Sequence, residues 1–213
     1  MTPALLADRR GLYAITDGTH ADLLARAVAA LRGGATVLQY RDKSGDAMRR
    51  QAEAVALMEI CNAHAALCII NDDVDLARAV GAHGVHLGEH DADLLSARHT
   101  LGAQAIIGVS CYDDLAHARA AAAQGANYLA FGAFYPSPSK PQARRAHPQL
   151  LREARHLGLP LVAIGGITPD NGAALIAAGA DFLAVISGVF AAPDSEAAAR
   201  RYSDLFTSSM PKP

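Results

Sequence analysis

The chain alternates between short apolar runs and longer, alanine-rich segments. Eight apolar runs have the length and near-continuous hydrophobicity of buried strands. They cover residues 12–16, 37–41, 67–71, 84–87, 106–110, 128–131, 161–164 and 182–186. Between them, helical spacing of alanine and leucine predicts helices that include residues 21–32, 47–64, 91–101, 113–124 and 171–178. The pattern therefore predicts strands that alternate with helices along the chain.

A Gly-Ala pair recurs where a helical segment gives way to a strand. It occupies positions 34–35, 81–82, 102–103, 125–126 and 179–180. Glycine accepts the left-handed backbone conformation that ends many helices. We therefore interpret these glycines as helix caps and not as phosphate ligands.

Eight parallel strands joined by helical crossovers favour a closed barrel. Such crossovers are right-handed, and strands buried on both faces close most simply into a (β/α)8 TIM barrel. We predict this α/β fold in a single domain spanning residues 1–213. A doubly wound open sheet is the alternative. It is disfavoured because Thr16-Asp17-Gly18-Thr19 follows the first strand, where such folds carry G-x-G-x-x-G.

Composition and charge restrict the partners. The 213 residues are 51% hydrophobic, and 19 basic against 21 acidic residues give a formal net charge of −2. No global basic field attracts nucleic acid or an anionic membrane, so we expect small-molecule substrates and neither of those partners. Three cysteines without zinc-type spacing, and the lack of a long apolar segment, indicate a cytoplasmic protein. A homo-oligomer is compatible with these features but is not specified by them.

Polar side chains gather where the second strand ends. Residues 37–43 read VLQYRDK, and Gln39, Arg41 and Lys43 share one face because strand side chains alternate. Two cations at a barrel mouth repel each other unless an anion lies between them. The alternative is a solvated strand end whose cations pair with Asp42 or Asp46.

Carboxylates follow the next two strands. Asn71 and Asp72 close the third strand, and Asp91 begins the helix after the fourth. Because Mg²⁺ prefers hard oxygen ligands, Asp72 and Asp91 predict one Mg²⁺ per subunit, completed by substrate phosphate and water. Asp91 has a second interpretation as a helix N-cap.

Two later loops are candidates for binding a second anion. Gly165-Gly166 and Ile186-Ser187-Gly188 follow the last two strands, where barrels commonly hold a phosphate through backbone N–H groups. Their alternative is glycine required by tight turns. The longest loop, residues 132–147, is either a lid or a plain surface excursion.

The remaining titratable residues do not announce a nucleophile. His83, His86 and His90 straddle a strand and a turn, so they make a weak metal set. No arrangement of serine, cysteine and histidine indicates covalent catalysis, which favours electrostatic stabilisation of a leaving group.

Six segments then occur in a specific order. They are GGATVLQYRDK at 33–43, INDDVDLA at 70–77, GVHLG at 84–88, GVS at 108–110, PSPSK at 136–140 and VAIGGI at 162–167. With these segments the chain resembles the thiamine phosphate synthase family over nearly its whole length. The resemblance implies a (β/α)8 barrel that joins hydroxymethylpyrimidine diphosphate to a thiazole phosphate and releases diphosphate.

The resemblance also implies roles for individual residues. Those implied for catalysis are Arg41, Lys43, Ser110 and Lys140. Those implied for pyrimidine diphosphate binding are Gln39, Tyr40, Arg41, Asp42, Lys43, Asn71, Ser110 and Lys140. Those implied for thiazole phosphate binding are Ser137, Pro138, Ser139, Gly166, Ile186 and Ser187. Asp72 and Asp91 would bind Mg²⁺.

The sequence departs from the family pattern in the sixth loop. Family members usually carry Gly-Pro and Pro-Thr-x-Thr-Lys there, whereas this chain has Gly132-Ala133 and serines at 137 and 139, which retain the hydroxyl donor. Glu89 stands where glutamine is common. Two alternatives stay open. One is a thiazole tautomerase of the same fold, whose sixth loop carries a catalytic histidine where this chain reads Gly132-Ala133-Phe134. The other is a thiamine-precursor binding or regulatory protein.

Overall fold

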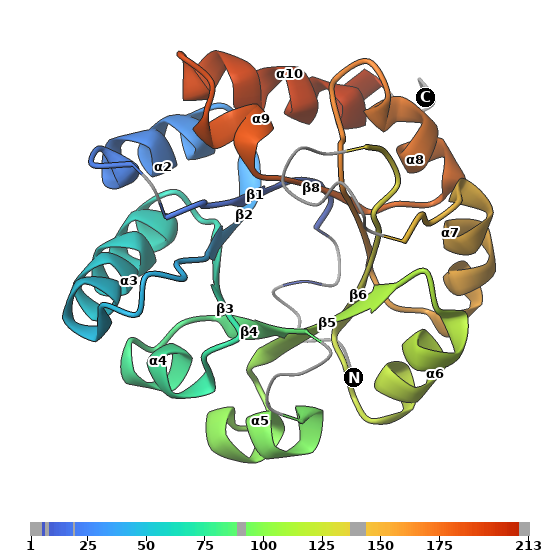
Figure 1. Cartoon of the computed structure of the whole chain (residues 1–213), viewed down its shortest axis with the longest axis horizontal. Helices are drawn as coiled ribbons and strands as arrows, with labels where there is room; N and C mark the ends of the chain where they lie inside the picture. The colour runs from blue at the N-terminus through green and yellow to red at the C-terminus, as the bar shows by residue number, and fades with distance from the viewer. Residues whose placement is uncertain (1–5, 7–8, 19, 89–92, 137–143, 209–213) are drawn as a thin grey trace.

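The strands form a closed parallel barrel with the helices outside it (Figure 1). The computed structural model describes residue 6 and residues 9–18, 20–88, 93–136 and 144–208. The strands are β1 (Gly11–Ile15), β2 (Ala35–Tyr40), β3 (Leu67–Asn71), β4 (Gly84–Leu87), β5 (Ile106–Tyr112), β6 (Tyr128–Phe131), β7 (Leu161–Ile164) and β8 (Phe182–Val185). Because β1 pairs with both β2 and β8, the predicted TIM barrel is confirmed and the open sheet is wrong.

The helices follow the strands in sequence. They are α2 (Leu23–Arg32), α3 (Ala47–Ala63), α4 (Val74–Ala79), α5 (Leu94–Leu101), α6 (Leu115–Ala123), α7 (Pro148–Ala154), α8 (Gly172–Ala178), α9 (Ser187–Phe190) and α10 (Ser195–Ser208), with a 3-10 turn, η1 (Arg155–Leu157). The five predicted helices are present. The helix predicted from residue 91 starts later, at Leu94, because Asp93 is its N-cap.

Aspartate side chains fix the starts of four successive helices. Asp46, Asp73, Asp93 and Asp114 each accept hydrogen bonds from backbone N–H groups in the first turn of α3, α4, α5 and α6. Such caps stabilise a helix by about 1 kcal/mol each. They also fix the loops that leave the C-terminal ends of the strands.

The Gly-Ala junctions have the predicted conformation. The glycines at 34, 81, 102, 125 and 179 all have positive φ, between 65° and 116°. Between α3 and β3 the same turn is made by Ala65, with φ 53°, followed by Ala66. The sequence pattern missed this sixth junction because alanine replaces glycine.

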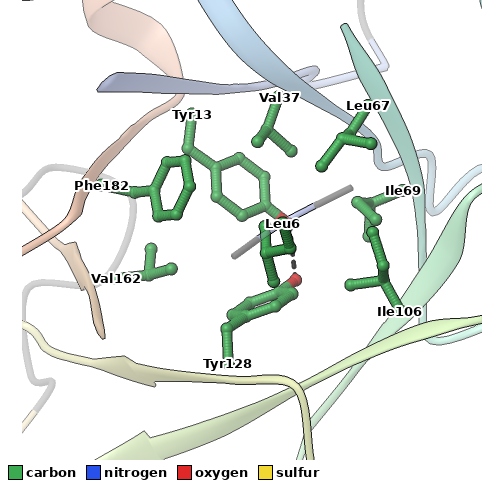
Figure 2. Close-up of a pocket in the computed structure, with 9 residues that line it drawn as sticks. All are labelled: Leu6, Tyr13, Val37, Leu67, Ile69, Ile106, Tyr128, Val162 and Phe182. Carbon is green, nitrogen blue, oxygen red and sulfur yellow. Dashed lines mark hydrogen bonds between the residues drawn. The ribbon is translucent and has the colours of Figure 1, made fainter. Parts of the chain in front are cut away.

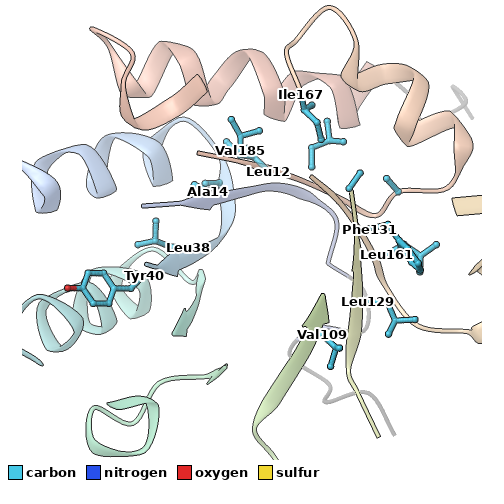
Figure 3. Packing of buried hydrophobic residues seen from close by; sticks show 14 of the residues in the cluster. Leu12, Ala14, Leu38, Tyr40, Val109, Leu129, Phe131, Leu161, Ile167 and Val185 are labelled. Atoms are coloured by element: carbon cyan, nitrogen blue, oxygen red, sulfur yellow. The ribbon is translucent and has the colours of Figure 1, made fainter. Parts of the chain in front are cut away.

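Alternating side chains along each strand divide the core into two layers. Tyr13, Val37 and Phe182 belong to an inner cluster that fills the barrel, and Leu6 lies among these side chains (Figure 2). This cluster leaves essentially no space for a water molecule, so the barrel is a packed core. An outer cluster packs between strands and helices (Figure 3). The three cysteines are buried and unpaired.

Inward-facing positions become polar toward the C-terminal ends of the strands. In β3, Leu67 and Ile69 lie in the inner cluster, and Asn71 follows two residues later. In β5, the buried Ile106 is followed on the same face by Gly108 and Ser110. This change of character puts hydrogen-bonding groups at one mouth of the barrel.

Candidate active site

A cleft of about 340 Å³ lies where β2 and β3 end. It is lined by Asp42, Lys43, Gly45, Arg50, Asn71, Asp72 and Asp73. Four of these had been singled out from the sequence, so the structure brings them together. Arg50 was missed: it lies on α3, away from any strand end, and its guanidinium contacts Asp73 at 2.8 Å.

The two candidate cations at the end of β2, Arg41 and Lys43, do not form ion pairs with the neighbouring carboxylates of Asp42 and Asp46. Asp42 and Asp46 both pair with Arg49, at 2.5 Å and 3.9 Å. Within the described residues, neither Arg41 nor Lys43 forms an ion pair with them. The interpretation of this region as a strand end neutralised by Asp42 or Asp46 is therefore wrong.

Asp42 orders the loop that carries Lys43. Its carboxylate is 2% exposed and accepts hydrogen bonds from the Ser44 N–H at 2.7 Å and from Arg49. Burial alone would raise the pKa of Asp42, but the hydrogen bonds from Ser44 and the Arg49 guanidinium hold the pKa below its usual value. The Asp42 carboxylate thus stays charged, and its hydrogen bonds to Ser44 and Arg49 hold the loop in place.

Tyr40 does not face the barrel mouth. Its ring lies in the outer cluster beside α3, and its hydroxyl donates to Glu53 Oε2 at 2.6 Å (Figure 3). Burial, together with the Glu53 carboxylate, raises the pKa of Tyr40. The Tyr40 side chain thus points away from the mouth, and the ligand role that the resemblance implies for Tyr40 stays a prediction. Strand alternation is the physical reason, since Tyr40 lies between the inward positions of Gln39 and Arg41.

Buried neighbours hold Gln39 and the Arg41 backbone. Gln39 is 3% exposed and donates from Nε2 to the Tyr13 hydroxyl at 2.8 Å. The buried Thr16 hydroxyl accepts from the Arg41 N–H at 2.8 Å and lies 3.1 Å from the Arg41 carbonyl. These contacts fix the direction in which β2 leaves the barrel.

Ser110 is joined to a histidine that the sequence pattern undervalued. Its Oγ lies 2.9 Å from His86 Nε2, and His86 Nδ1 lies 2.9 Å from the Tyr128 hydroxyl. Because strand side chains alternate, Gly84 and His86 lie on the inner face of β4. This alternation is the sequence signal that could have identified His86 as a residue of the barrel mouth. His83 instead accepts from the Cys68 N–H at 3.0 Å.

Asp72 lies at the third strand's end in a left-handed conformation, with φ 64°. Its N–H donates to the His86 carbonyl at 2.8 Å, which ties the loop to β4. The N-cap role considered for Asp91 belongs to Asp93. Asp91 itself lies outside the described residues, as do Ser137, Pro138, Ser139 and Lys140.

The second candidate anion site lies at the ends of β7 and β8. A Cβ on Gly166, whose φ is 63°, would approach the Pro136 carbonyl oxygen at 2.3 Å. Glycine is thus required where the sixth loop crosses β7. Ile186 is partly buried against the inner cluster, and Ser187 is exposed at the start of α9.

The described residues contain neither a cluster of metal-binding side chains nor a membrane-spanning helix. In those ranges, no three His, Cys, Asp or Glu side chains are grouped so that they could hold a metal ion. Within the same ranges, every helix falls short of the length and hydrophobicity that a membrane span needs.

Comparison with known proteins places the chain in a family. A family model described as thiamine monophosphate synthase matches residues 12–189. The chain belongs to the thiamine monophosphate synthase family. A thiamine-phosphate synthase of Thioalkalivibrio sulfidiphilus is 58% identical over 201 residues, covering 92% of this chain and 95% of the relative. One from Xanthomonas campestris is 56% identical over 204 residues, covering 95% and 98%.

A solved member of the thiamine monophosphate synthase family has the same barrel. The thiamine phosphate pyrophosphorylase of Pyrococcus furiosus superposes with a TM-score of 0.86 at 34% identity, covering 93% of this chain and 96% of that one. The chain is thus a transferase of thiamine biosynthesis, and the expectation of a thiamine phosphate synthase is confirmed. The relatives' names favour it over the tautomerase and the regulatory protein.

Proposed function

We propose that this enzyme couples 4-amino-2-methyl-5-hydroxymethylpyrimidine diphosphate to 4-methyl-5-(2-hydroxyethyl)thiazole phosphate or its carboxylated form. The products are thiamine phosphate and diphosphate, and the carboxylated form would in addition release its carboxyl group as CO2. The observation that carries the proposal is the cleft in which Lys43 and Arg50 lie beside Asn71 and Asp72. Cations and amide donors gathered at strand ends suit a diphosphate.

The proposed reaction is dissociative. The C–O bond between the pyrimidine methylene and the diphosphate breaks, and both electrons leave with the diphosphate oxygen. The resulting pyrimidinylmethyl cation is stabilised by its ring and is captured by the lone pair of the thiazole nitrogen. Arg41 and Lys43, with Lys140 by family resemblance, stabilise the departing charge, while Gln39, Asn71 and Ser110 orient the pyrimidine diphosphate.

The oxygen donors of the cleft fit one Mg²⁺. Asp72 and the neighbouring amide of Asn71 supply the hard oxygen atoms that this ion prefers. Asp73 is bound by Arg50 and caps α4, and the family resemblance gives the ligand roles to Asp72 and Asp91. When bound, the ion would neutralise negative charge on the diphosphate.

The thiazole phosphate is assigned to the ends of β7 and β8. Gly166, Ile186 and Ser187 follow neighbouring strands, and the family pattern adds Ser137, Pro138 and Ser139. Three further predictions are untested: that residues 1–213 form one domain, that the protein is cytoplasmic, and that it forms a homo-oligomer.

The test is product formation from the two phosphorylated precursors with Mg²⁺. We expect thiamine phosphate and diphosphate in equal amounts. Lys43→Gln should lower kcat/KM by about tenfold to a hundredfold, because one charge-assisted contact is lost. Arg78→Gln, which removes only an exposed ion pair, is the matched control. Binding without product would favour the regulatory protein, and thiazole isomerisation without coupling would favour the tautomerase.

A further inference from the structure

A chain of hydrogen bonds crosses the interior of the barrel. Gln39 Nε2 donates to the Tyr13 hydroxyl at 2.8 Å, which lies 2.7 Å from the Tyr128 hydroxyl. The Tyr128 hydroxyl lies 2.9 Å from His86 Nδ1, and His86 Nε2 lies 2.9 Å from Ser110 Oγ. Five residues on five strands thus connect two of the side chains proposed to bind the pyrimidine diphosphate.

The middle of this chain is shielded from water. Tyr13 and Tyr128 are each 2% exposed, and Figure 2 shows their hydroxyls meeting among apolar side chains. The His86 ring stacks on Tyr128 with centroids 5.6 Å apart. A Cβ on Gly108 would lie 1.9 Å from Tyr128 Cζ, so the glycine leaves the space for this ring. Burial raises the pKa of both tyrosines, so each hydroxyl keeps its single proton.

Counting protons along the chain gives it a direction. An amide nitrogen only donates, so Tyr13 accepts from Gln39 and passes its own proton toward Tyr128. Tyr128 then donates to His86 Nδ1. The His86 ring must carry its hydrogen on Nε2, where it donates to Ser110 Oγ. The proton of Ser110 is consequently left to point away from His86.

We propose that Gln39 sets the direction of this chain and thereby fixes Ser110 as a hydrogen-bond donor toward the substrate. Tyr13, Tyr128 and His86 are positioning residues in this scheme. A hydroxyl held as a donor suits a diphosphate oxygen that gains negative charge as it leaves. The role of Ser110 toward substrate rests on the proposed function, whereas the direction of the chain does not.

The opposite direction makes a distinct prediction. If Gln39 presented its amide oxygen to Tyr13, every donor would reverse. Tyr128 would donate to Tyr13, His86 Nδ1–H to Tyr128, and Ser110 would give its proton to His86 Nε2. The position of the His86 ring hydrogen therefore reports the direction.

NMR of the substrate-free protein, with histidine nitrogens labelled, reads that position. His86→Gln assigns the His86 signals by their loss. We expect an unprotonated Nδ1 and a protonated Nε2. In Gln39→Glu, above the pKa of the new carboxylate, only acceptors face Tyr13, so Nδ1 should gain a proton. Gln51→Glu makes the same change at an exposed position of α3 and should leave the His86 signals unchanged.

Two NMR results would overturn the proposal. One is a proton on Nδ1 in the unmodified protein. The other is an unprotonated Nδ1 in Gln39→Glu while the carbon shift of the introduced carboxylate shows it to be ionised. Both are read without turnover, so they are independent of whether the proposed coupling reaction is correct.

A double-mutant cycle, measured by kcat, then tests whether Tyr13 acts through Ser110. Tyr13→Phe removes one hydroxyl and should lower kcat by about fivefold to tenfold, the worth of one buried hydrogen bond. In a Ser110→Ala background the same change should have little effect, because the end of the chain is gone. Tyr128→Phe provides a second variant. Equal losses in both backgrounds would show that the tyrosines do not act through Ser110.

Discussion

At the scale of single residues, Asp72 combines an unusual backbone with a proposed functional carboxylate. Its φ of 64° lies in the left-handed region, which aspartate and asparagine tolerate better than other non-glycine residues. Its N–H is held by the His86 carbonyl. Charge and conformation are therefore separable by substitution.

We predict that Asp72→Asn and Asp72→Ala both lower turnover at limiting Mg²⁺ by about a thousandfold. Losing one close charge pair in a partly shielded site costs roughly 4 kcal/mol. Only Asp72→Ala should also lower the free energy of unfolding, by about 1 kcal/mol, because alanine tolerates this conformation less well. Product assays and urea titrations measure the two effects. Undiminished turnover in Asp72→Asn would remove Asp72 from the metal site.

Alternation along a strand explains what the sequence could predict about side chains. It placed Gln39 inward, and the structure agrees. It also places the Tyr40 side chain outward, which the Glu53 contact confirms, while the ligand role that the family pattern gives Tyr40 stays a prediction. His86 was undervalued because its partners, Ser110 and Tyr128, lie 24 and 42 residues away, and separations of that kind are not visible in local patterns.

At the scale of elements, the turn after α3 repeats the turn after α4 with a less suitable residue. Ala65 N–H and Ala66 N–H donate to the carbonyls three and five residues earlier, at 3.2 and 2.9 Å. Gly81 and Ala82 make the same two bonds at the same distances. The hydrogen bonds match, so the residue at the left-handed position is the relevant difference.

We predict that Ala65→Gly raises the free energy of unfolding by about 1 kcal/mol, because it relieves the left-handed strain at an exposed position. Gly81→Ala should lower it by a similar amount. A Cβ there meets no atom within 4 Å, so the cost is conformational. Thermal unfolding should show shifts of about 2–4 °C in opposite directions. Shifts of the same sign would contradict this account.

Elements with strong local signals were predictable from the sequence. The eight strands were found because each is a continuous apolar run between helices. Short helices such as α9, with four residues, carry too little periodicity to be recognised. The start of α5 was misplaced because Asp91 and Asp93 are both suitable caps, and only the structure shows which one bonds the first turn.

At the scale of the whole molecule, the barrel depends on contacts between the two ends of the chain. The register of β1 on β8 closes the sheet. Outside it, the Arg200 guanidinium of α10 donates to the Arg32 carbonyl at the end of α2, at 3.3 Å. The count of strands predicted a closed barrel, but these closing contacts are too distant in sequence to be read from a pattern.

Arg26 on α2 makes a closing contact that can be tested alone. Its guanidinium donates to the carbonyls of Phe190 and Ala192, at 3.1 and 2.9 Å, and to Asp22. It thereby ties α2 to the C-terminal end of α9. The side chain is 23% exposed, so these bonds are partly shielded from water.

We predict that Arg26→Ala lowers the free energy of unfolding by about 2 kcal/mol, because two charged bonds to backbone carbonyls are lost. Arg78→Ala is the matched control: its ion pair with Asp75 is largely exposed, so a change below about 0.5 kcal/mol is expected. Urea titration compares the two. If Arg26→Ala cost no more than Arg78→Ala, closure would rest on strand pairing and core packing alone. A drop confined to Arg26→Ala would show that a side chain outside the sheet contributes to closure in addition to the pairing of β1 with β8.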